Sequence, residues 1–204
     1  MSKPLRADAA RNRDRLRSAA EKVFAERGLD APLEEVARRA EVSIGTLYNH
    51  FASRDDLLYA TLPRSLPAEL DRLTADALAA DDPWDGFVAY IEGLFRLHAE
   101  DQAFSDLMTQ RHPVPSELLA ACGAHLGQAS EILARAQKAG HIRPGFTLAD
   151  QMDLFRALAP FIRETRATEP DAWRRLLAFY LNGIRTESAR PVEVPPVERS
   201  ESAR

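Results

Sequence analysis

The fold of this chain is decided by the stretch Leu33-Glu-Glu-Val-Ala-Arg-Arg-Ala-Glu-Val-Ser-Ile-Gly-Thr-Leu-Tyr-Asn-His-Phe51. Apolar residues recur at helical spacing up to Ala40 and again after Ser43, which predicts two short helices. Ser43 is suited to cap the second helix through its hydroxyl. Because only Glu41 and Val42 lie between the two segments, the helices must cross steeply. The stretch therefore predicts a helix-turn-helix.

The second of these helices has two different faces. Leu47 and Phe51 are expected to anchor it inward, while the opposite face carries small polar residues, namely Ser43, Gly45, Thr46 and Asn49. Gly45 lets another backbone approach closely, Thr46 offers a hydroxyl and a methyl to a base edge, and Asn49 can hydrogen-bond a base or a phosphate. These four residues are the candidates for sequence-specific contact with DNA.

The segment upstream of the helix-turn-helix is predicted to be a helix of the same small domain. Its apolar face begins after Arg11, and Gly28 suits a left-handed stop at its end. Residues 1–9 lack periodicity and are expected to form a loose arm that can order on a polyanion. The domain is predicted to span residues 10–62.

The segment downstream begins with a capping box of Ser53 and Asp56, which predicts a further helix. Pro63 and Pro67 then interrupt the helical pattern. We expect a joint there, between the small domain and a larger domain over residues 63–186.

Every periodic segment of the larger domain has the spacing of a helix, and no strand pattern occurs. Its helix boundaries are marked by Asp82-Pro83, by Pro113 and Pro115, by Gly140, by a capping box of Thr147 and Asp150, and by Pro170. Residues 187–204 combine three prolines with charged residues and are expected to be disordered. The predicted fold is all-α, with an N-terminal helix-turn-helix domain joined to a larger helical ligand-binding and dimerisation domain.

Charge and composition narrow the class of protein. The net charge is −4, yet residues 1–54 carry eleven Lys or Arg against eight Asp or Glu, while residues 55–204 carry sixteen against twenty-three. The basic end is therefore the end that holds the helix-turn-helix. Cys122 is the single cysteine, which excludes an intrachain disulfide and a thiolate zinc cluster. No apolar run approaches the roughly 18 residues of a membrane span, so we expect a cytoplasmic protein with no membrane partner.

The quoted stretch, followed by Ser53-Arg-Asp-Asp-Leu57, resembles the helix-turn-helix of the TetR family of bacterial regulators. The likeness covers roughly residues 11–60, and Gly140-His-Ile-Arg-Pro-Gly145 is a weaker one. The resemblance implies a homodimer, a recognition helix in the major groove, and a C-terminal core in which a small-molecule effector sets the DNA affinity. Repression is the family default.

The resemblance also implies phosphate contacts by Tyr48, His50 and Arg54. The alternative is structural, because Tyr48 can be partly core and His50 can cap a neighbour. Two features depart from the family pattern. Glu41 stands where the family often has glycine, and Ala31-Pro32 stands where a threonine commonly begins the helix and touches a phosphate. We expect that phosphate contact to be missing.

Candidates for the effector pocket are aromatic, soft or polar residues at helical spacing, although such residues are also typical of an ordinary core. They are Trp84, Phe87, Phe95, His98, Phe104, Met108, His112, Gln151 and Phe155. The histidines lack the spacing of a helical metal site, so no metal and no cofactor are expected.

The last two helices carry more apolar residues than one inward face requires, which predicts a dimer interface of Met152, Phe155, Trp173, Leu177, Tyr180 and Ile184.

Two other classes of function are alternatives to a DNA-binding regulator. An enzyme needs a positioned nucleophile, base or metal, and the chain has no G-x-S-x-G, no Gly-rich phosphate loop and no paired His-Glu helix motif. A helical ligand-binding protein without specific DNA binding is the other alternative. The sequence favours a DNA-binding regulator, which we expect to be a repressor that binds a palindromic operator as a homodimer and is released by a small molecule.

Overall fold

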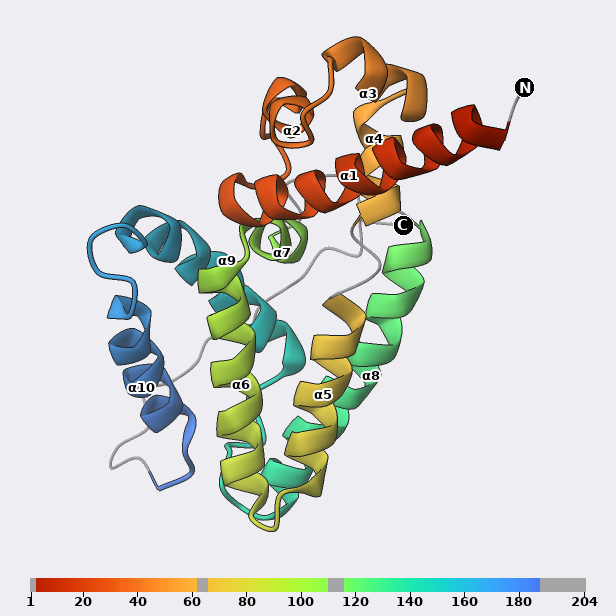
Figure 1. Cartoon of the computed structure of the whole chain (residues 1–204). Helices are drawn as coiled ribbons and strands as arrows, with labels where there is room; N and C mark the ends of the chain where they lie inside the picture. Colours follow the sequence, from red (N-terminus) through yellow and green to blue (C-terminus); the bar gives the residue numbers. More distant parts are fainter. Residues whose placement is uncertain (1–2, 62–65, 110–115, 188–204) are drawn as a thin grey trace, which may run out of the picture.

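The computed structural model describes residues 3–61, 66–109 and 116–187, with side chains over 8–61, 68–109 and 125–187. These parts form ten helices (Figure 1): α1 (Lys3–Arg27), α2 (Leu33–Arg39), α3 (Ile44–His50), α4 (Arg54–Thr61), α5 (Leu66–Ala79), α6 (Pro83–Glu100), α7 (Gln102–Met108), α8 (Ser116–Lys138), α9 (Leu148–Thr165) and α10 (Ala172–Ile184). They contain no strand, only a lone antiparallel bridge between Ile142 and Arg185. The predicted all-α fold is confirmed. Outside the described residues lie Pro63, Pro113, Pro115, His112, the side chain of Cys122 and the tail from residue 188.

Helices α1 to α4 pack around one apolar core, in which α1 packs against α2 and α4, and α3 packs against α2 (Figure 1). The predicted helix-turn-helix consists of α2 and α3, and the turn between them places Glu41 at φ 54°. A non-glycine residue in this left-handed conformation costs about 1–2 kcal/mol, which the surrounding packing offsets. The predicted capping box is also present, since Ser53 and Asp56 bond each other's backbone N–H at 3.1 Å.

The start of α1 differs from the prediction. The helix begins at Lys3 and not near Arg11, so the expected loose arm over residues 1–9 is wrong from residue 3 onward. Pro4 lies in the first helical turn, where the missing N–H has no helical acceptor and the fixed φ suits a helix. The same reasoning applies to Pro67, the second residue of α5.

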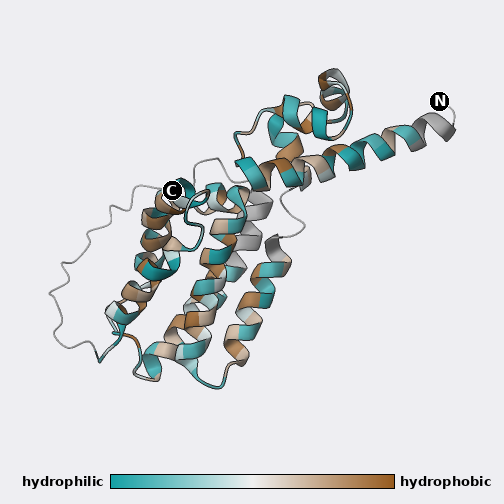
Figure 2. Ribbon diagram, turned by 60° about the vertical axis from the view of Figure 1, so that its left-hand side comes forward, coloured by the Kyte–Doolittle hydropathy of each residue, from teal (hydrophilic) through white to brown (hydrophobic). Residues whose placement is uncertain are grey.

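Helices α5, α6, α8, α9 and α10 form the larger domain around a second apolar core. Hydrophobic and hydrophilic residues alternate around these helices in Figure 2, which is the pattern of amphipathic helices that bury one face. Asp82 caps α6, and Thr147 with Asp150 forms the predicted capping box of α9. Gly140 follows α8 at φ 83°, as its position predicted. The last helix begins two residues after Pro170, at Ala172.

The short helix α7 belongs to both cores. Ala103 and Leu107 are buried in the core of α1 to α4, while Phe104 is buried in the core of the larger domain. This helix follows α6 after the single residue Asp101, whose side chain accepts a hydrogen bond from the Phe104 N–H at 3.0 Å. A shift of α7 therefore affects the packing of both domains.

Candidate nucleic-acid interface and C-terminal core

Helix α3 is held in place by its two apolar anchors and its cap. Leu47 and Phe51 are both buried, as predicted. Ser43 caps the helix by accepting a hydrogen bond from the Thr46 N–H at 3.1 Å, and its Oγ lies 2.9 Å from the Thr46 hydroxyl. The Arg13 guanidinium of α1 lies 4.9 Å from the centre of the Phe51 ring. The inner face of α3 is thus fixed against the domain, and the outer face is left for other contacts.

The outer face of α3 carries the predicted DNA contacts. Ser43, Gly45, Tyr48 and Asn49 are exposed, whereas Thr46 and His50 are half-buried. The Tyr48 side chain is 50% exposed, although aromatic rings are usually covered. A methyl group at Gly45 would meet only the Ser43 Oγ at 3.8 Å, an ordinary contact. Packing within the chain therefore does not require glycine at this position, where alanine would favour the helix by about 1 kcal/mol.

Arg54 forms two hydrogen bonds within the chain that the sequence did not predict. Its Nη1 donates hydrogen bonds to the carbonyl oxygens of Leu29 and Ala31, both at 2.8 Å, and so ties the loop between α1 and α2 to the start of α4. The same loop ends at Pro32, which precedes α2 without a side-chain cap. The contact of Arg54 with phosphate stays a prediction.

A buried carboxylate joins the two domains. Asp106 of α7 accepts a hydrogen bond from the Leu29 N–H at 2.9 Å and pairs with Arg163 of α9 at 2.5 Å. Leu29 directly follows Gly28, which ends α1 with φ 84°. A methyl group at Gly28 would overlap the Asp106 Oδ2 atom. The turn that leads into the helix-turn-helix therefore fits against one carboxylate of the larger domain.

Several of the predicted pocket residues meet in the core of the larger domain. Phe95 stacks on Phe155 with ring centres 4.5 Å apart, and His98 stacks on the same phenylalanine at 5.4 Å. Phe104 meets His98 edge-on at 5.2 Å. Burial lowers the pKa of His98 to about 4, which keeps its imidazole neutral at pH 7. Gln151 is also buried and lies one helical turn before Phe155.

The remaining pocket candidates are arranged differently. Trp84 lies at the start of α6, where it stacks on Phe87 at 6.2 Å and faces Arg185 at 5.0 Å. Met108 is half-buried against the core, and His112 lies outside the described residues. Trp84 and Phe87 are not in ring contact with the group around His98. The candidates therefore form more than one group.

The two domains each match a known protein family. Residues 16–61 match the bacterial regulatory proteins of the tetR family, and residues 82–186 match the C-terminal domain of SbtR-like transcriptional regulators. The chain belongs to the TetR family of transcriptional regulators. This TetR-family chain is 28% identical over 166 residues to the regulator SrpR of Pseudomonas putida, a match that covers 78% of the chain and 76% of SrpR. A regulator of Staphylococcus aureus is 36% identical over 63 residues, which are 30% of the chain and 34% of that protein.

Solved structures agree on the fold. The ketosteroid regulator KstR2 of Mycobacterium tuberculosis superposes with a TM-score of 0.57 at 22% identity, covering 86% of this chain and 95% of KstR2. The fatty acid degradation regulator FadR of Bacillus halodurans gives a TM-score of 0.55 at 20% identity, covering 82% and 96%. At these identities the likeness is one of fold.

The last helix of this TetR-family regulator exposes different residues from those predicted for a dimer interface. Trp173, Leu177 and Ile184 are buried within the chain itself, as is Phe155 of α9, so none of these predicted residues offers a surface to a second copy. The exposed apolar side chains of α10 are Leu176, at 39%, and Phe179, at 62%. Leu176 lies one position before Leu177, and Phe179 lies one position before Tyr180, so the exposed face of α10 differs from the predicted one. That α10 takes part in a dimer stays a prediction.

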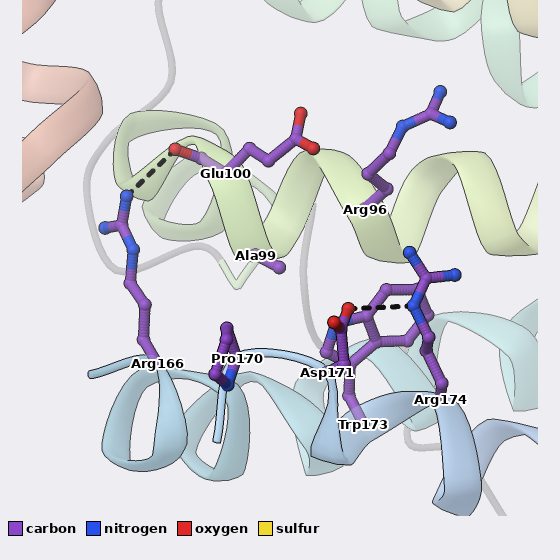
Figure 3. Close-up of a pocket in the computed structure, with 8 residues that line it drawn as sticks. All are labelled: Arg96, Ala99, Glu100, Arg166, Pro170, Asp171, Trp173 and Arg174. Atoms are coloured by element: carbon purple, nitrogen blue, oxygen red, sulfur yellow. Dashed lines mark hydrogen bonds and ion pairs between the residues drawn. The ribbon is translucent and has the colours of Figure 1, made fainter. Parts of the chain in front are cut away.

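A surface cleft of about 370 Å³ lies between α6 and the segment that joins α9 to α10 (Figure 3). Its basic residues have partners within the chain. Arg166 donates to the carbonyl oxygens of Glu100 at 3.0 Å and Glu26 at 3.3 Å, and Arg174 donates to Asp171 at 2.9 Å. The bond to Glu26 links the residue that follows α9 to α1. Of the residues that line the cleft, Arg166 thus also contributes to the joint between the domains.

Sequence reasoning missed Gln102, Asp106, Arg163 and Arg166. A signal for Asp106 was available, because it lies on the same helical face as Ala103 and Leu107, where a charged residue is unexpected.

No three His, Cys, Asp or Glu side chains of the described ranges are grouped so as to hold a metal. A search of the described helices for one that could cross a membrane finds none.

Proposed function

We propose that this regulator is a repressor that binds a palindromic operator as a homodimer and is released when a small molecule occupies its C-terminal core. Family membership supports DNA binding and transcription control. The repression, the operator symmetry, the dimer and the release are the parts that we add. We place the protein in the cytoplasm, where it reaches the chromosome.

The observation that carries the DNA-binding part is the outer face of α3. An exposed tyrosine, an exposed asparagine and an unneeded glycine lie together on a helix whose other face is fixed by Leu47 and Phe51. A buried or purely structural helix has no use for this combination. We propose that Ser43, Gly45, Thr46 and Asn49 face base edges and that Tyr48, His50 and Arg54 contact phosphates.

The exposed face of α10 supports the homodimer. Leu176 and Phe179 lie one helical turn apart, and the Arg175 guanidinium covers part of the Phe179 ring at 5.0 Å. Large apolar side chains on one helical face are typical of an interface between copies. With the two copies related by a two-fold axis, the operator has two similar half-sites in opposite orientation.

The experiment that tests the proposal is a selection of randomised duplex DNA with the purified protein. We expect a palindrome, bound with an affinity that falls as the salt concentration rises. Binding is then compared between the wild type and Gly45→Ala. The added methyl is expected to stabilise α3 by about 1 kcal/mol and to weaken operator binding, because it stands where the backbone of α3 approaches the DNA.

Opposite changes in stability and affinity separate this function from a structural role of Gly45. If no sequence is enriched, and Gly45→Ala changes only stability, the chain is a helical ligand-binding protein without specific DNA binding. If the enriched site lacks two-fold symmetry, the homodimeric part of the proposal is wrong.

A further inference from the structure

We infer that the C-terminal core recognises a neutral, planar aromatic molecule that carries a hydroxyl group, and that His98, Gln102 and Gln151 form the hydrogen bonds to it. The inference rests on the proposed function in one respect, the presence of a ligand in this core. It adds the chemical class of that ligand and the residues that select it.

Three buried polar side chains in this region lack partners among the described residues. Both ring nitrogens of His98, the Nε2 atom of Gln102 and the Oε1 atom of Gln151 have no hydrogen bond. The exposed fraction of His98 is 0%. Buried polar groups are nearly always hydrogen-bonded in folded proteins, and an unpaired one destabilises the fold. Three such groups in adjoining helices are suited to bind a molecule from outside the chain.

The three side chains come from helices that pack against one another. His98 lies on α6, Gln102 begins α7, and Gln151 lies on the inner face of α9, one turn before Phe155. Phe155 stacks on His98 with an angle of 9° between the rings, and Phe104 lies against the edge of the imidazole. A molecule that enters between aromatic side chains of this kind is favoured when its body is planar and apolar.

The charge of the site favours a neutral ligand. Because burial lowers the pKa of His98 to about 4, the imidazole is neutral and offers one donor and one acceptor. No lysine or arginine is among the buried side chains of the described ranges, so a buried carboxylate ligand would have no cation to pair with. The nearby Asp106 is already paired with Arg163.

A hydroxyl group matches the free atoms. It donates one hydrogen bond, which Gln151 Oε1 or a ring nitrogen of His98 can accept. It also accepts, which suits the Gln102 Nε2 or the protonated ring nitrogen of His98. A ligand without polar groups would leave all of these atoms unpaired, and this difference is the source of the selectivity.

The test uses three probes of nearly equal shape, namely phenol, toluene and benzoate, each titrated against the full chain without DNA by saturation-transfer NMR. One aromatic ring fits any site that accepts a larger aromatic ligand. We expect phenol and toluene to bind and benzoate to give no signal. The decisive quantity is the ratio of the phenol affinity to the toluene affinity, because the ratio cancels their shared hydrophobic contribution.

We expect this ratio to fall at least tenfold in His98→Phe and in Gln151→Met, which keep the approximate volume and remove the polar atoms. The control is Thr74→Val, since the buried Thr74 hydroxyl already bonds the carbonyl oxygens of Leu70 and Asp71 at 3.0 Å. Its ratio should match the wild type. The melting temperature of the free protein should rise in His98→Phe, since unpaired nitrogens are removed from an aromatic environment.

The inference is overturned if phenol does not bind, if benzoate binds as well as phenol, or if the ratio is unchanged in both variants. A melting temperature that falls in His98→Phe would also count against it, because the nitrogens would then have partners in the free protein. Operator selection is measured separately. Phenol selectivity without an operator would contradict the proposed function and leave this inference intact, whereas an operator without phenol binding would do the reverse.

Discussion

Gly28 and Gly140 form a natural pair for testing the joint between the domains. Both adopt left-handed backbone conformations, with φ of 84° and 83°. A methyl group at Gly140 would meet no atom within 4 Å, whereas at Gly28 it would overlap the Asp106 carboxylate. The change to alanine therefore has the same backbone effect at both positions, and only Gly28→Ala has to displace Asp106.

The expected magnitudes follow from the contacts. The left-handed conformation costs an alanine about 1–2 kcal/mol, which is the whole effect in Gly140→Ala. Displacing Asp106 removes a charged acceptor from the buried Leu29 N–H, worth about 1.5–3 kcal/mol. Loss of the Arg163 pair adds at most about 1 kcal/mol, because that side chain is 38% exposed and can be hydrated. Gly28→Ala should thus cost about 2.5–6 kcal/mol.

A double-mutant cycle with Asp106→Ala isolates the contact. Without the carboxylate the methyl at position 28 has room, so Gly28→Ala in that background should cost only the backbone value of about 1–2 kcal/mol. Urea unfolding of all variants at one protein concentration gives the four free energies. Equal costs at Gly28 and Gly140, or a coupling below about 0.5 kcal/mol, would refute the idea that the turn fits against Asp106.

Three further changes test other parts of the structure. Arg54→Ala should lower the free energy of unfolding by about 1–3 kcal/mol, because the hydrogen bonds to Leu29 and Ala31 are lost. It should also reduce the slope of log DNA affinity against log salt concentration by about one unit. If that slope is unchanged, Arg54 has only the structural role. The depressed pKa of His98 means that the unfolded chain binds a proton between pH 6.5 and 4 while the folded chain does not, so stability should fall by about 2 kcal/mol from pH 7 to 5. That part of the loss should be absent from His98→Phe when both are unfolded in urea at each pH. Phe179→Asp should shift the dimer toward monomer in sedimentation velocity while Thr74→Val does not, and a stable Phe179→Asp dimer would place the interface elsewhere.

The sequence was sufficient for the parts of the fold that local rules control. Ser43 and the Thr147–Asp150 box are helix starts whose chemistry lies within four residues, and both were predicted correctly. The left-handed conformation of Glu41 agrees with the glycine that the family often has at this position, which is a matter of resemblance and not of a local rule. Even the error at the N-terminus is local, since the lack of periodicity before Arg11 was taken as lack of helix. An exposed helix needs no apolar face.

Local sequence rules do not predict tertiary contacts. Asp106 and Arg163 are 57 residues apart, and nothing in the spacing of either predicts their pairing. The outward face of α10 was misjudged for a related reason. Residues at helical spacing reveal that a helix is amphipathic, but a helix that is apolar on two sides does not show which side its own domain covers. Trp173 faces inward because Phe95 stacks against it at 5.9 Å, a contact between α6 and α10.

The position of α7 connects the surroundings of His98 in the larger domain with the Gly28 turn of the small domain. Phe104 contacts His98 in the larger domain, and Asp106, two residues later, holds the Leu29 N–H at the entry to α2. Because His98 is fully buried, a molecule that bonds to it has to separate the side chains around it, and Phe104 is one of them. Moving Phe104 shifts Asp106, since both belong to a helix of two turns. The Gly28 turn, which has no space beside that carboxylate, would then have to shift with it. In the function that we propose, this shift is how a bound molecule would change the position of α3 relative to the operator.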